Sequence, residues 1–473
     1  MAISATGVGS GLDVKSIVSQ LVAIEKQPLK PLQAKATVFQ TQLSLYGKIK
    51  SQASALGDAA ALLAGASGWN AQKAISSNSA AVGVTADASA VAAALSVSVG
   101  QLARAQSSAS VGVAAGVAVG ATGSLNIERG SWSAAATPVF TPAGALIPPI
   151  SIASGDTVSA IAGKINAANA GVTATVLRDG ANERLVIRSA TTGEAAGFRL
   201  NTPADAGLAA LGFTNPSDVG PAPGPIFVGQ TALNAKVTIN GVAVVSDTNK
   251  MANVTPGVTL QLNQVTTAPA EITVANDLDA VTKNIQGFVD TYNALNQTLT
   301  DATKYSAATK TGGPLQGDAT TMALQNTLRA ILGSSSVGST FSRLSEAGIE
   351  RQTDGSLKVN ATKLASAQQN LPNLQNLFAT NNNNAATNGF GLKVRDFARG
   401  LVASDGSVSN KSKALQGSIS SNSKDQDRVN DRASRVEAQL YKQYSALDTQ
   451  MAQLNGLNSY VTAQLAQWNK STR

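Results

Sequence analysis

Two pairs of carboxylates are the best candidates in this chain for catalytic residues, judged by residue type and spacing. Asp425 is followed closely by Asp427, and Glu346 lies one helical turn before Glu350. Two carboxylates can divide the roles of general acid and general base only where a pocket sets their pKa values apart. Aromatic residues, which usually line such pockets, make up only 4% of the chain. We therefore interpret both pairs as solvated helix or loop residues.

Other catalytic and metal-binding chemistry finds little support in the sequence. The chain contains no histidine and no cysteine, which removes the commonest general base, the commonest metal ligand and the thiolate nucleophile. Gly7, Gly9 and Gly11 faintly resemble a phosphate loop, but no strand precedes them and no Gly-Lys-Ser/Thr follows. We expect no catalytic residue, no cofactor and no metal site, and hence a protein that is not an enzyme.

The positive charge of the chain lies mainly at its two ends. Residues 1–74 carry seven Lys or Arg against three Asp or Glu, and residues 411–473 carry nine against five. Because no dense basic run is interleaved with aromatic residues, nucleic-acid binding is not expected. No segment is apolar for the roughly 20 residues that a membrane helix needs, and the N-terminus lacks the pattern of a cleaved secretory signal.

An amphipathic helix is predicted from Asp13 onward, because Asp13 is a good N-cap and apolar residues follow it at helical spacing. Pro28 and Pro31 should end this helix and start a second one, from about Leu32 to Leu63. The apolar face of the first helix comprises Val14, Ile17, Val18, Leu21 and Ile24.

Residues 74–274 change to the alternating pattern of strands. Residues 81–86 and 95–100 alternate as half-buried strands do. Asp179-Gly180 and Asn240-Gly241 each separate two such runs, and Asn-Gly is a strong hairpin signal because both turn residues must take positive φ. These residues predict a mainly antiparallel β region.

This β region is predicted to contain an inner lobe. One short helix is expected from Thr157 to Ala168, where Val158, Ile161 and Ile165 recur at helical spacing. Two proline-rich stretches, Thr137 to Pro149 and Pro216 to Pro225, are interpreted as loops that bracket the lobe.

Helical periodicity returns after the β region. Helices are predicted at residues 277–299, 322–332, 371–378 and 412–468, with a hairpin at residues 349–359. The elements together predict an α+β multidomain fold, in which both termini form a coiled-coil or helical-bundle stalk and two β-rich head domains are inserted. The predicted parts are terminal coiled-coil segments at 1–40 and 430–473, a helical bundle domain at 41–74 and 277–429, a β-rich head domain at 75–115 and 226–276, and an inserted outer β-rich domain at 116–225.

The C-terminal helix carries the most regular pattern of the sequence, with large residues at alternating spacings of four and three, as in a coiled coil. A polar a residue, here Asn458, restricts pairing at a cost in stability when it is buried. The stripe needs a helical partner, which is either the N-terminal helix or another chain. We call the stripe the C-terminal seam; its d positions are Leu440, Leu447, Leu454, Val461 and Trp468, and its a positions are Tyr444, Met451, Asn458 and Leu465.

Several segments resemble the family of flagellar filament cap proteins, also called hook-associated protein 2. Residues 7–29 read GVGSGLDVKSIVSQLVAIEKQPL, and residues 239–262 read INGVAVVSDTNKMANVTPGVTLQL. Residues 315–332, 344–367 and 441–468 follow the family pattern too. Within the inner lobe, SGDTVSAIAGKINAANAGVTATV resembles a repeat found in flagellins and their relatives. Together these segments cover most of the chain.

The resemblance implies a homo-oligomer at the distal tip of a bacterial flagellar filament, beneath which flagellin subunits are inserted. It implies export through the flagellar export system without a cleaved signal, and hence an extracellular location. The implied partners are flagellin, hook–filament junction proteins, the export apparatus and an export chaperone. The oligomer or filament interface would comprise the apolar face of the first helix and the C-terminal seam.

Two other classes of protein remain open. Flagellin itself or a junction protein would also have helical ends around a β middle, although the N-terminal motif and the INGVAVVSDTNK segment favour the cap. A surface adhesin would use the β head to bind a host glycan or mucin, and a cap could do this as well.

Overall fold

The computed structural model describes residues 13–134, 138–144, 146–201, 208 and 226–471. Its contacts divide the chain into a helical unit, residues 1–69 and 281–473, and a β-rich unit, residues 70–280. No helix in the described part of the chain is long and apolar enough to cross a membrane.

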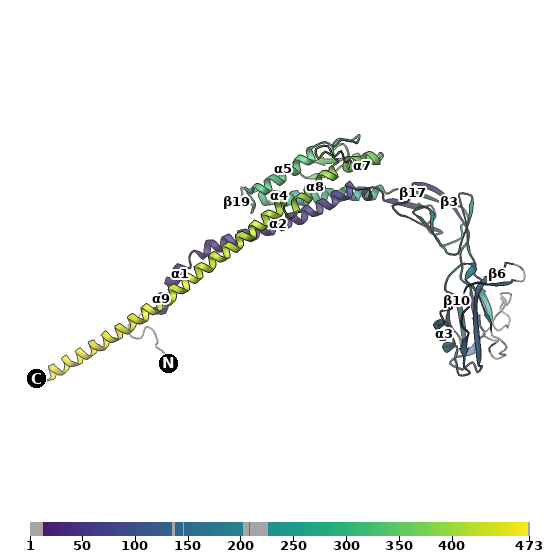
Figure 1. Ribbon diagram of the computed structural model, residues 1–473, viewed down its shortest axis with the longest axis horizontal. Helices are drawn as coiled ribbons and strands as arrows, with labels where there is room; N and C mark the ends of the chain where they lie inside the picture. The colour runs from purple at the N-terminus through teal and green to yellow at the C-terminus, as the bar shows by residue number, and fades with distance from the viewer. Residues whose placement is uncertain (1–12, 135–137, 145, 202–207, 209–225, 472–473) are drawn as a thin grey trace. The chain divides into compact units, whose positions relative to one another are not determined.

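The helical unit combines the N-terminal helices α1 and α2 with the C-terminal helix α9 (Figure 1). The long helix α2 packs against both α8 and α9, while α1 runs beside α9. The helices are α1 (Val14–Glu25), α2 (Leu29–Ala64), α4 (Leu278–Thr303), α5 (Ala319–Gly333), α6 (Ala361–Gln368), α7 (Leu371–Ala379), α8 (Phe390–Val402) and α9 (Ser407–Ser471), with a 3₁₀ turn η1 (Ala66–Gly68) and two hairpins, β18 (Tyr305–Ser306) with β19 (Thr311–Gly312) and β20 (Ile349–Arg351) with β21 (Leu357–Val359).

The core of the helical unit is assembled from α2 and from α4 to α9. Trp69 is buried at the end of α2, where its Nε1 donates to the Leu63 carbonyl at 2.8 Å. Its ring lies 5.7 Å from that of Phe378, which in turn meets Phe288 edge-on at 6.1 Å. On α2, the apolar residues that recur at helical spacing from Tyr46 to Leu63 are buried. The helical period of the sequence therefore identified the buried face of this helix.

Proline marks the start of α2 as expected, and a glycine marks its end. Pro28 occupies the N-cap and Pro31 lies in the first turn, where its missing N–H costs no helical bond. Gly65 ends the helix in an extended conformation. By contrast, α6 and α8 were not predicted. Three glycines in or beside α8 made its sequence resemble a loop, although Phe390 and Val394 are buried in the core.

The first part of the β-rich unit is a sandwich of two antiparallel sheets. One has the strand order β1-β17-β3-β13-β14 and the other β15-β16-β2. Valine, leucine and isoleucine side chains from both sheets fill the space between them. Asn240 and Gly241 have φ of 49° and 83°, which confirms the predicted hairpin turn. The strands are β1 (Gln72–Ser76), β2 (Val82–Ala86), β3 (Ala93–Gln101), β13 (Ala235–Ile239), β14 (Val242–Ser246), β15 (Lys250–Thr255), β16 (Val258–Leu262) and β17 (Ala270–Asn276).

The second part of the β-rich unit has two further sheets and one helix. In one sheet β4, β5 and β9 pair with β10 and β12 pairs with β4; in the other, β7, β8 and β11 pair with β6. The predicted helix is present as α3 (Val158–Ala167), capped by Thr157, and it packs on β9. The strands are β4 (Ser107–Ser110), β5 (Val113–Ala114), β6 (Gly123–Trp132), β7 (Phe140–Pro142), β8 (Ile150–Ile152), β9 (Val172–Asp179), β10 (Asn182–Ser189), β11 (Gly197–Asn201) and β12 (Ile226–Gln230), with a 3₁₀ turn η2 (Glu194–Ala196).

Two expectations for this region need correction. The outer domain was predicted to span residues 116–225, but β4, β5 and β12 belong to the sheet of β10 and lie outside those limits. Such long-range pairings leave no trace in local periodicity. The stretch from Thr137 to Pro149 was predicted to be a loop, but it contains β7, in which Phe140 is buried. The second proline-rich stretch, residues 216–225, lies outside the described residues.

Candidate assembly interface

The N-terminal helix α1 runs along α9 (Figure 1) and packs against it through a narrow row of valines. Its start is fixed by Asp13, whose Oδ1 accepts a hydrogen bond from the Ser16 backbone N–H at 3.0 Å. A spacing of four places the valines one above another on one face of the helix. Ala433 on α9 completes the buried cluster of Val14, Val18, Val22 and Ala433, against which Leu440, Tyr441 and Tyr444 are partly buried.

The buried face of α1 differs from the predicted one near the end of the helix. Ile17 and Leu21 are half-buried, and Ile24 is 57% exposed. Val22, which the prediction omitted, is buried instead. The reason is that α9 contacts a single i, i+4 row. At this end Glu25 also forms an ion pair with Arg432, with 3.0 Å between Oε2 and Nε.

The C-terminal seam is divided between two environments. Leu440 and Tyr444 lie against α1, so this part pairs within the chain. Beyond Tyr444, the side chain of Met451 is half-buried and that of Asn458 is exposed. The remaining large side chains are exposed by 43% at Leu447, 59% at Leu454, 46% at Val461, 53% at Leu465 and 71% at Trp468.

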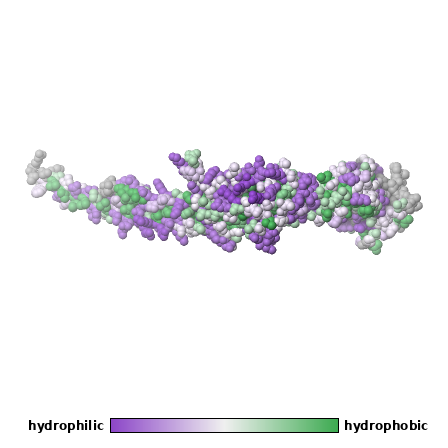
Figure 2. Space-filling model, turned by 90° about the horizontal axis from the view of Figure 1, so that it is seen from above, coloured by the Kyte–Doolittle hydropathy of each residue, from purple (hydrophilic) through white to green (hydrophobic). Residues whose placement is uncertain are grey.

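Two further apolar residues, missed by the heptad pattern, extend this surface. Leu457 is 60% exposed and Tyr460 is 62% exposed. At about 100° per residue, the large apolar side chains from Tyr460 round to Met451 cover about half of the helix circumference. A helical projection of residues 447–468, rather than the heptad alone, would have found them. We call the exposed apolar side chains of residues 447–468 the tail stripe; Figure 2 shows hydrophobic residues along this end of α9.

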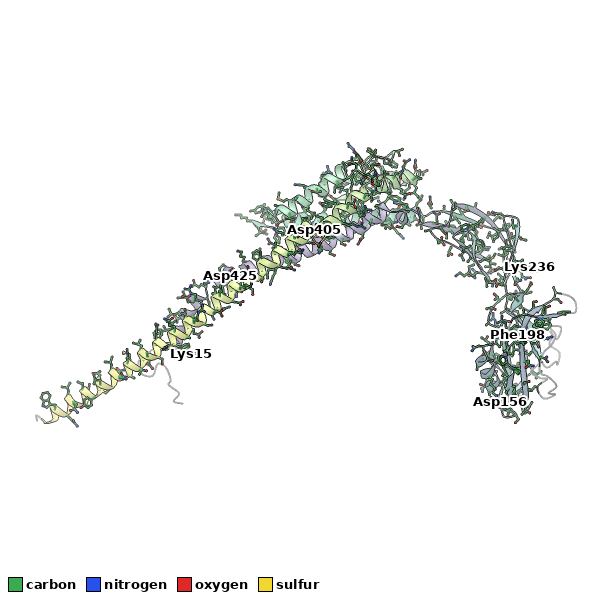
Figure 3. The ribbon with its side chains drawn as sticks, in the orientation of Figure 1. Lys15, Asp156, Phe198, Lys236, Asp405 and Asp425 are labelled. Carbon is green, nitrogen blue, oxygen red and sulfur yellow. The ribbon has the colours of Figure 1, made fainter. Side chains whose placement is uncertain are left out.

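The segment that carries the tail stripe contains a single charged residue, Asp448, near its start. Where α1 and α9 run together, charged residues such as Lys15 and Asp425 are present (Figure 3). From Thr449 to Asn469, however, no residue is Asp, Glu, Lys or Arg. Solvated helix faces are normally charged. A half-apolar helix without charge is therefore suited to contact with other helices.

A partly buried polar cluster fixes α9 to the rest of the helical unit. Lys411 Nζ lies 2.8 Å from Asp318 Oδ2, and the Tyr46 hydroxyl donates to Oδ1 of the same carboxylate. Burial opposes the ionisation of Asp318, but the hydrogen bonds from Lys411 and Tyr46 outweigh it and lower the pKa of Asp318 to about 2. Burial and the neighbouring carboxylate raise the pKa of Tyr46 above its ordinary value. The cluster thus joins α2, α5 and α9 before α9 leaves the bundle.

Carboxylates from both of the predicted pairs form surface ion pairs or hydrogen bonds. Asp425 forms an ion pair with Arg428 on the surface of α9, and Asp427 is exposed. Glu346 accepts hydrogen bonds from the backbone of Ser342, and Glu350 lies 2.8 Å from Lys363 Nζ. Within the described residues, no three Asp or Glu side chains lie close enough together to hold a metal ion.

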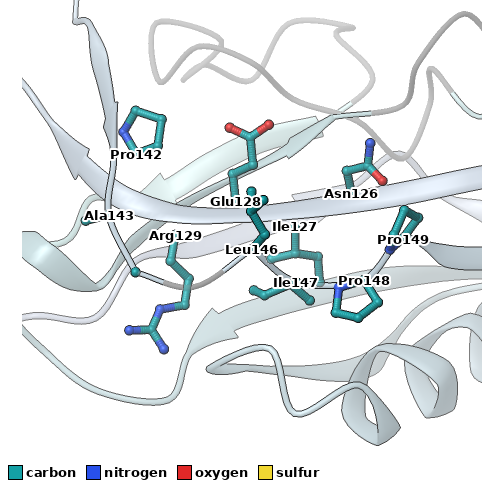
Figure 4. Close-up of a pocket in the computed structure, with 11 residues that line it drawn as sticks. Asn126, Ile127, Glu128, Arg129, Pro142, Ala143, Leu146, Ile147, Pro148 and Pro149 are labelled. Carbon is teal, nitrogen blue, oxygen red and sulfur yellow. The ribbon is translucent and has the colours of Figure 1, made fainter.

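A hollow in the β-rich unit lies beside β6 and the loop that follows β7 (Figure 4). Its volume is about 610 Å³, and proline and aliphatic side chains supply most of its wall. The carboxylate Glu128 on this wall is already paired with Arg199, with 2.6 Å between Oε2 and Nη2. The described lining therefore forms an apolar hollow but contains no acid–base pair. The lining includes Ile127, Pro142, Leu146, Ile147, Pro148 and Pro149.

Family models match most of the chain. The model of the flagellar hook-associated protein 2 C-terminus matches residues 232–456, and that of the N-terminus matches residues 10–106. The flagellin hook IN motif matches residues 145–191, which include α3 and the β9–β10 hairpin. The last match agrees with the flagellin-like repeat that the sequence indicated there.

Relatives and a solved structure agree with these models. Flagellar hook-associated protein 2 of Escherichia coli strain K12 is 28% identical over 98% of both chains. The protein of the same name from Salmonella typhimurium is 28% identical over 68% of this chain and 69% of its own length. The crystal structure of the flagellar cap protein FliD D1-D2-D3 domains from E. coli is similar with a TM-score of 0.57 and 26% identity, and covers 79% of this chain and 99% of the solved one.

Proposed function

The chain belongs to the flagellar hook-associated protein 2 family, and on this premise we propose that it caps the distal end of a bacterial flagellar filament as a homo-oligomer. The observation that carries the proposal is the tail stripe. It continues the C-terminal seam beyond α1 as an exposed, half-apolar helix without charge from Thr449 to Asn469. Such a surface is suited to assembly with further helices.

The mechanism that we propose is steric and non-covalent. The terminal helices hold the protein at the filament end through contacts with other copies and with flagellin. The β-rich domains cover the tip and leave gaps in which flagellin subunits are inserted, and the oligomer shifts as each gap is filled. Since α1 covers only the first part of the C-terminal seam, the tail stripe is available for contacts that form and break during this cycle.

The proposed partners follow from the same family. They are further copies of this chain, flagellin, hook–filament junction proteins, and the flagellar export apparatus with an export chaperone. Export by this route would place the protein outside the cell at the flagellum tip without a cleaved secretory signal. The proposal involves no catalysis.

A deletion strain tests this function. Removing the gene should leave cells that release unpolymerised flagellin into the medium, because the filament end is no longer closed. Expression of the full chain should restore filaments and reduce free flagellin. If filaments grew to normal length in the deletion strain, the protein would not be required for assembly and the proposal would be wrong.

A further inference from the structure

One strand of the β-rich unit ends a sheet and pairs with no described strand on its outer side. β14 is the last strand in the order β1-β17-β3-β13-β14. Its sequence is Val-Ala-Val-Val-Ser, and Val242 and Val245 are 64% and 60% exposed. Edge strands present unpaired N–H and C=O groups and are templates for pairing with another strand.

The hairpin geometry shows which backbone groups face outward. Ile239 and Val242 close a two-residue turn, and such a closing pair exchanges both of its hydrogen bonds. Hydrogen-bonded and non-hydrogen-bonded pairs alternate along an antiparallel ladder. The backbone N–H and C=O groups of Val244 and Ser246 therefore also point toward β13. The N–H and C=O of Ala243 and Val245 therefore point away from the sheet. They form a short, regular row of donors and acceptors.

Two other edges of the sandwich, β15 and β1, carry devices that discourage pairing, whereas β14 has none. β15 begins at Lys250, and its ladder with β16 is irregular around Asn253, which has a φ of 53°. β1 carries Lys73, whose Nζ pairs with Asp279 at 2.8 Å. Charged residues and bulges are the usual protection of an exposed edge. From Val242 to Ser246 there is no charge, no proline and no register shift.

We propose that β14 is an interface at which two copies of this chain pair strand to strand, antiparallel, about a two-fold axis at Val244. In this register Ala243 lies opposite Val245 of the second copy, so both outward-facing residues of each strand form hydrogen bonds. Val244 faces its own equivalent, and no like charges meet. The strand is thus complementary to itself, which is what a two-fold interface requires.

This contact differs from the one that a ring would use. Subunits around a ring meet head to tail, whereas a two-fold contact closes after two copies. The β14 pair therefore joins free copies or copies in separate rings. It depends neither on the tail stripe nor on the capping function, so it can fail or hold independently of them.

Cysteine cross-linking of the full chain tests the pairing, because the natural sequence has no cysteine. In a non-hydrogen-bonded antiparallel pair, opposite Cβ atoms lie about 4.5–5.5 Å apart, close to disulfide geometry. Mild oxidation of V244C should therefore give a covalent species of twice the 47.8 kDa chain mass. The added substitution V245K, which places a charge on the edge, should abolish that species.

V242C is the matched control. It lies on the same face of β14 and is more exposed, but its equivalent in the second copy would lie about 13 Å away along the strand. If cross-links formed by random collision, the more exposed V242C would cross-link more readily. The proposed register instead predicts that V244C cross-links more readily. A V244C chain that stays monomeric, or a V242C chain that cross-links as readily, would overturn the proposal.

Discussion

At the scale of single residues, the tail stripe makes Leu454 a sensitive position for assembly but not for folding. Its side chain is 59% exposed, so L454D removes little buried surface from the single chain. In an assembled seam the same change buries a carboxylate in a charge-free contact. We expect the unfolding midpoint to stay within a few degrees and flagellin assembly to be lost. L447D should act in the same direction.

S459D is the control for L454D. Ser459 is exposed and lies on the side of α9 away from the tail stripe, so the variant adds the same charge without entering the contact. Circular dichroism checks folding, and free flagellin in the medium of complemented cells checks function. Normal filaments with L454D, or equal loss with S459D, would show that the stripe is not the contacting surface.

Asp318 gives a second residue-scale prediction. Its pKa of about 2 lies below the ordinary value of 3.8, so the ionised form stabilises the folded state. This stabilisation is present above about pH 4 and is lost as the pH falls toward 2. D318N keeps the size and the N-cap of α5 but removes the charge beside Lys411.

We expect D318N to destabilise the helical unit by about 1–2 kcal/mol at pH 7, and the difference from the natural protein to shrink between pH 4 and pH 2. Denaturant titrations followed by circular dichroism at 222 nm measure this difference in the free energy of unfolding. A constant difference across this pH range would mean that the carboxylate charge is not the cause.

The structural roles of individual residues could be predicted where they depend only on local interactions. Asp13 and Thr157 cap helices because their side chains satisfy free N–H groups, and Asn240-Gly241 turns because both take positive φ. The burial of Val22 in place of Ile24 was not predictable. It depends on which row of α1 side chains contacts α9, and tertiary packing determines this.

At the scale of elements, the packing of α8 against α2 depends on Gly391. A Cβ at this position would lie 2.9 Å from Ala64 N and 3.0 Å from Ala60 O on α2, and 2.9 Å from Phe378 O. All three atoms belong to the backbone and cannot rotate away. G391A should therefore destabilise the helical unit by about 1–3 kcal/mol.

Gly400, in the same helix, provides the control. A Cβ there meets no atom within 4 Å, so G400A should be neutral or stabilise by up to about 1 kcal/mol. Thermal melts at 222 nm distinguish the two variants. Equal effects would mean that close packing at Gly391 does not hold the helices together. The same close contact explains why α8 was missed in the sequence: its glycines permit packing, but they resemble loop residues.

At the scale of the whole molecule, assembly through the tail stripe should depend little on salt. Ion pairs at a surface weaken as salt screens them, whereas apolar contacts do not. Since residues 449–469 carry no charge, self-association should be similar at about 50 mM and 500 mM salt. Sedimentation velocity of the full chain and of a chain lacking residues 449–473 measures it. Association that disappears at high salt, or that survives the truncation, would place the contact elsewhere.

The overall plan of helical ends around a β middle followed from periodicity, because a switch between helical and strand spacing is visible in the sequence. The limits of the β-rich parts did not follow, since β4, β5 and β12 join their sheet by long-range pairing. The flagellar family was identified from motifs at both ends and in the lobe, and the family models match the same segments. The interface residues stay a prediction.

Immunogold labelling of intact flagellated cells with an antibody against this chain tests the central claim most directly. The account predicts label confined to the distal tip of the filament. Label along the filament or at its base would contradict it and indicate a filament or junction subunit instead. Label on the cell body would contradict it too.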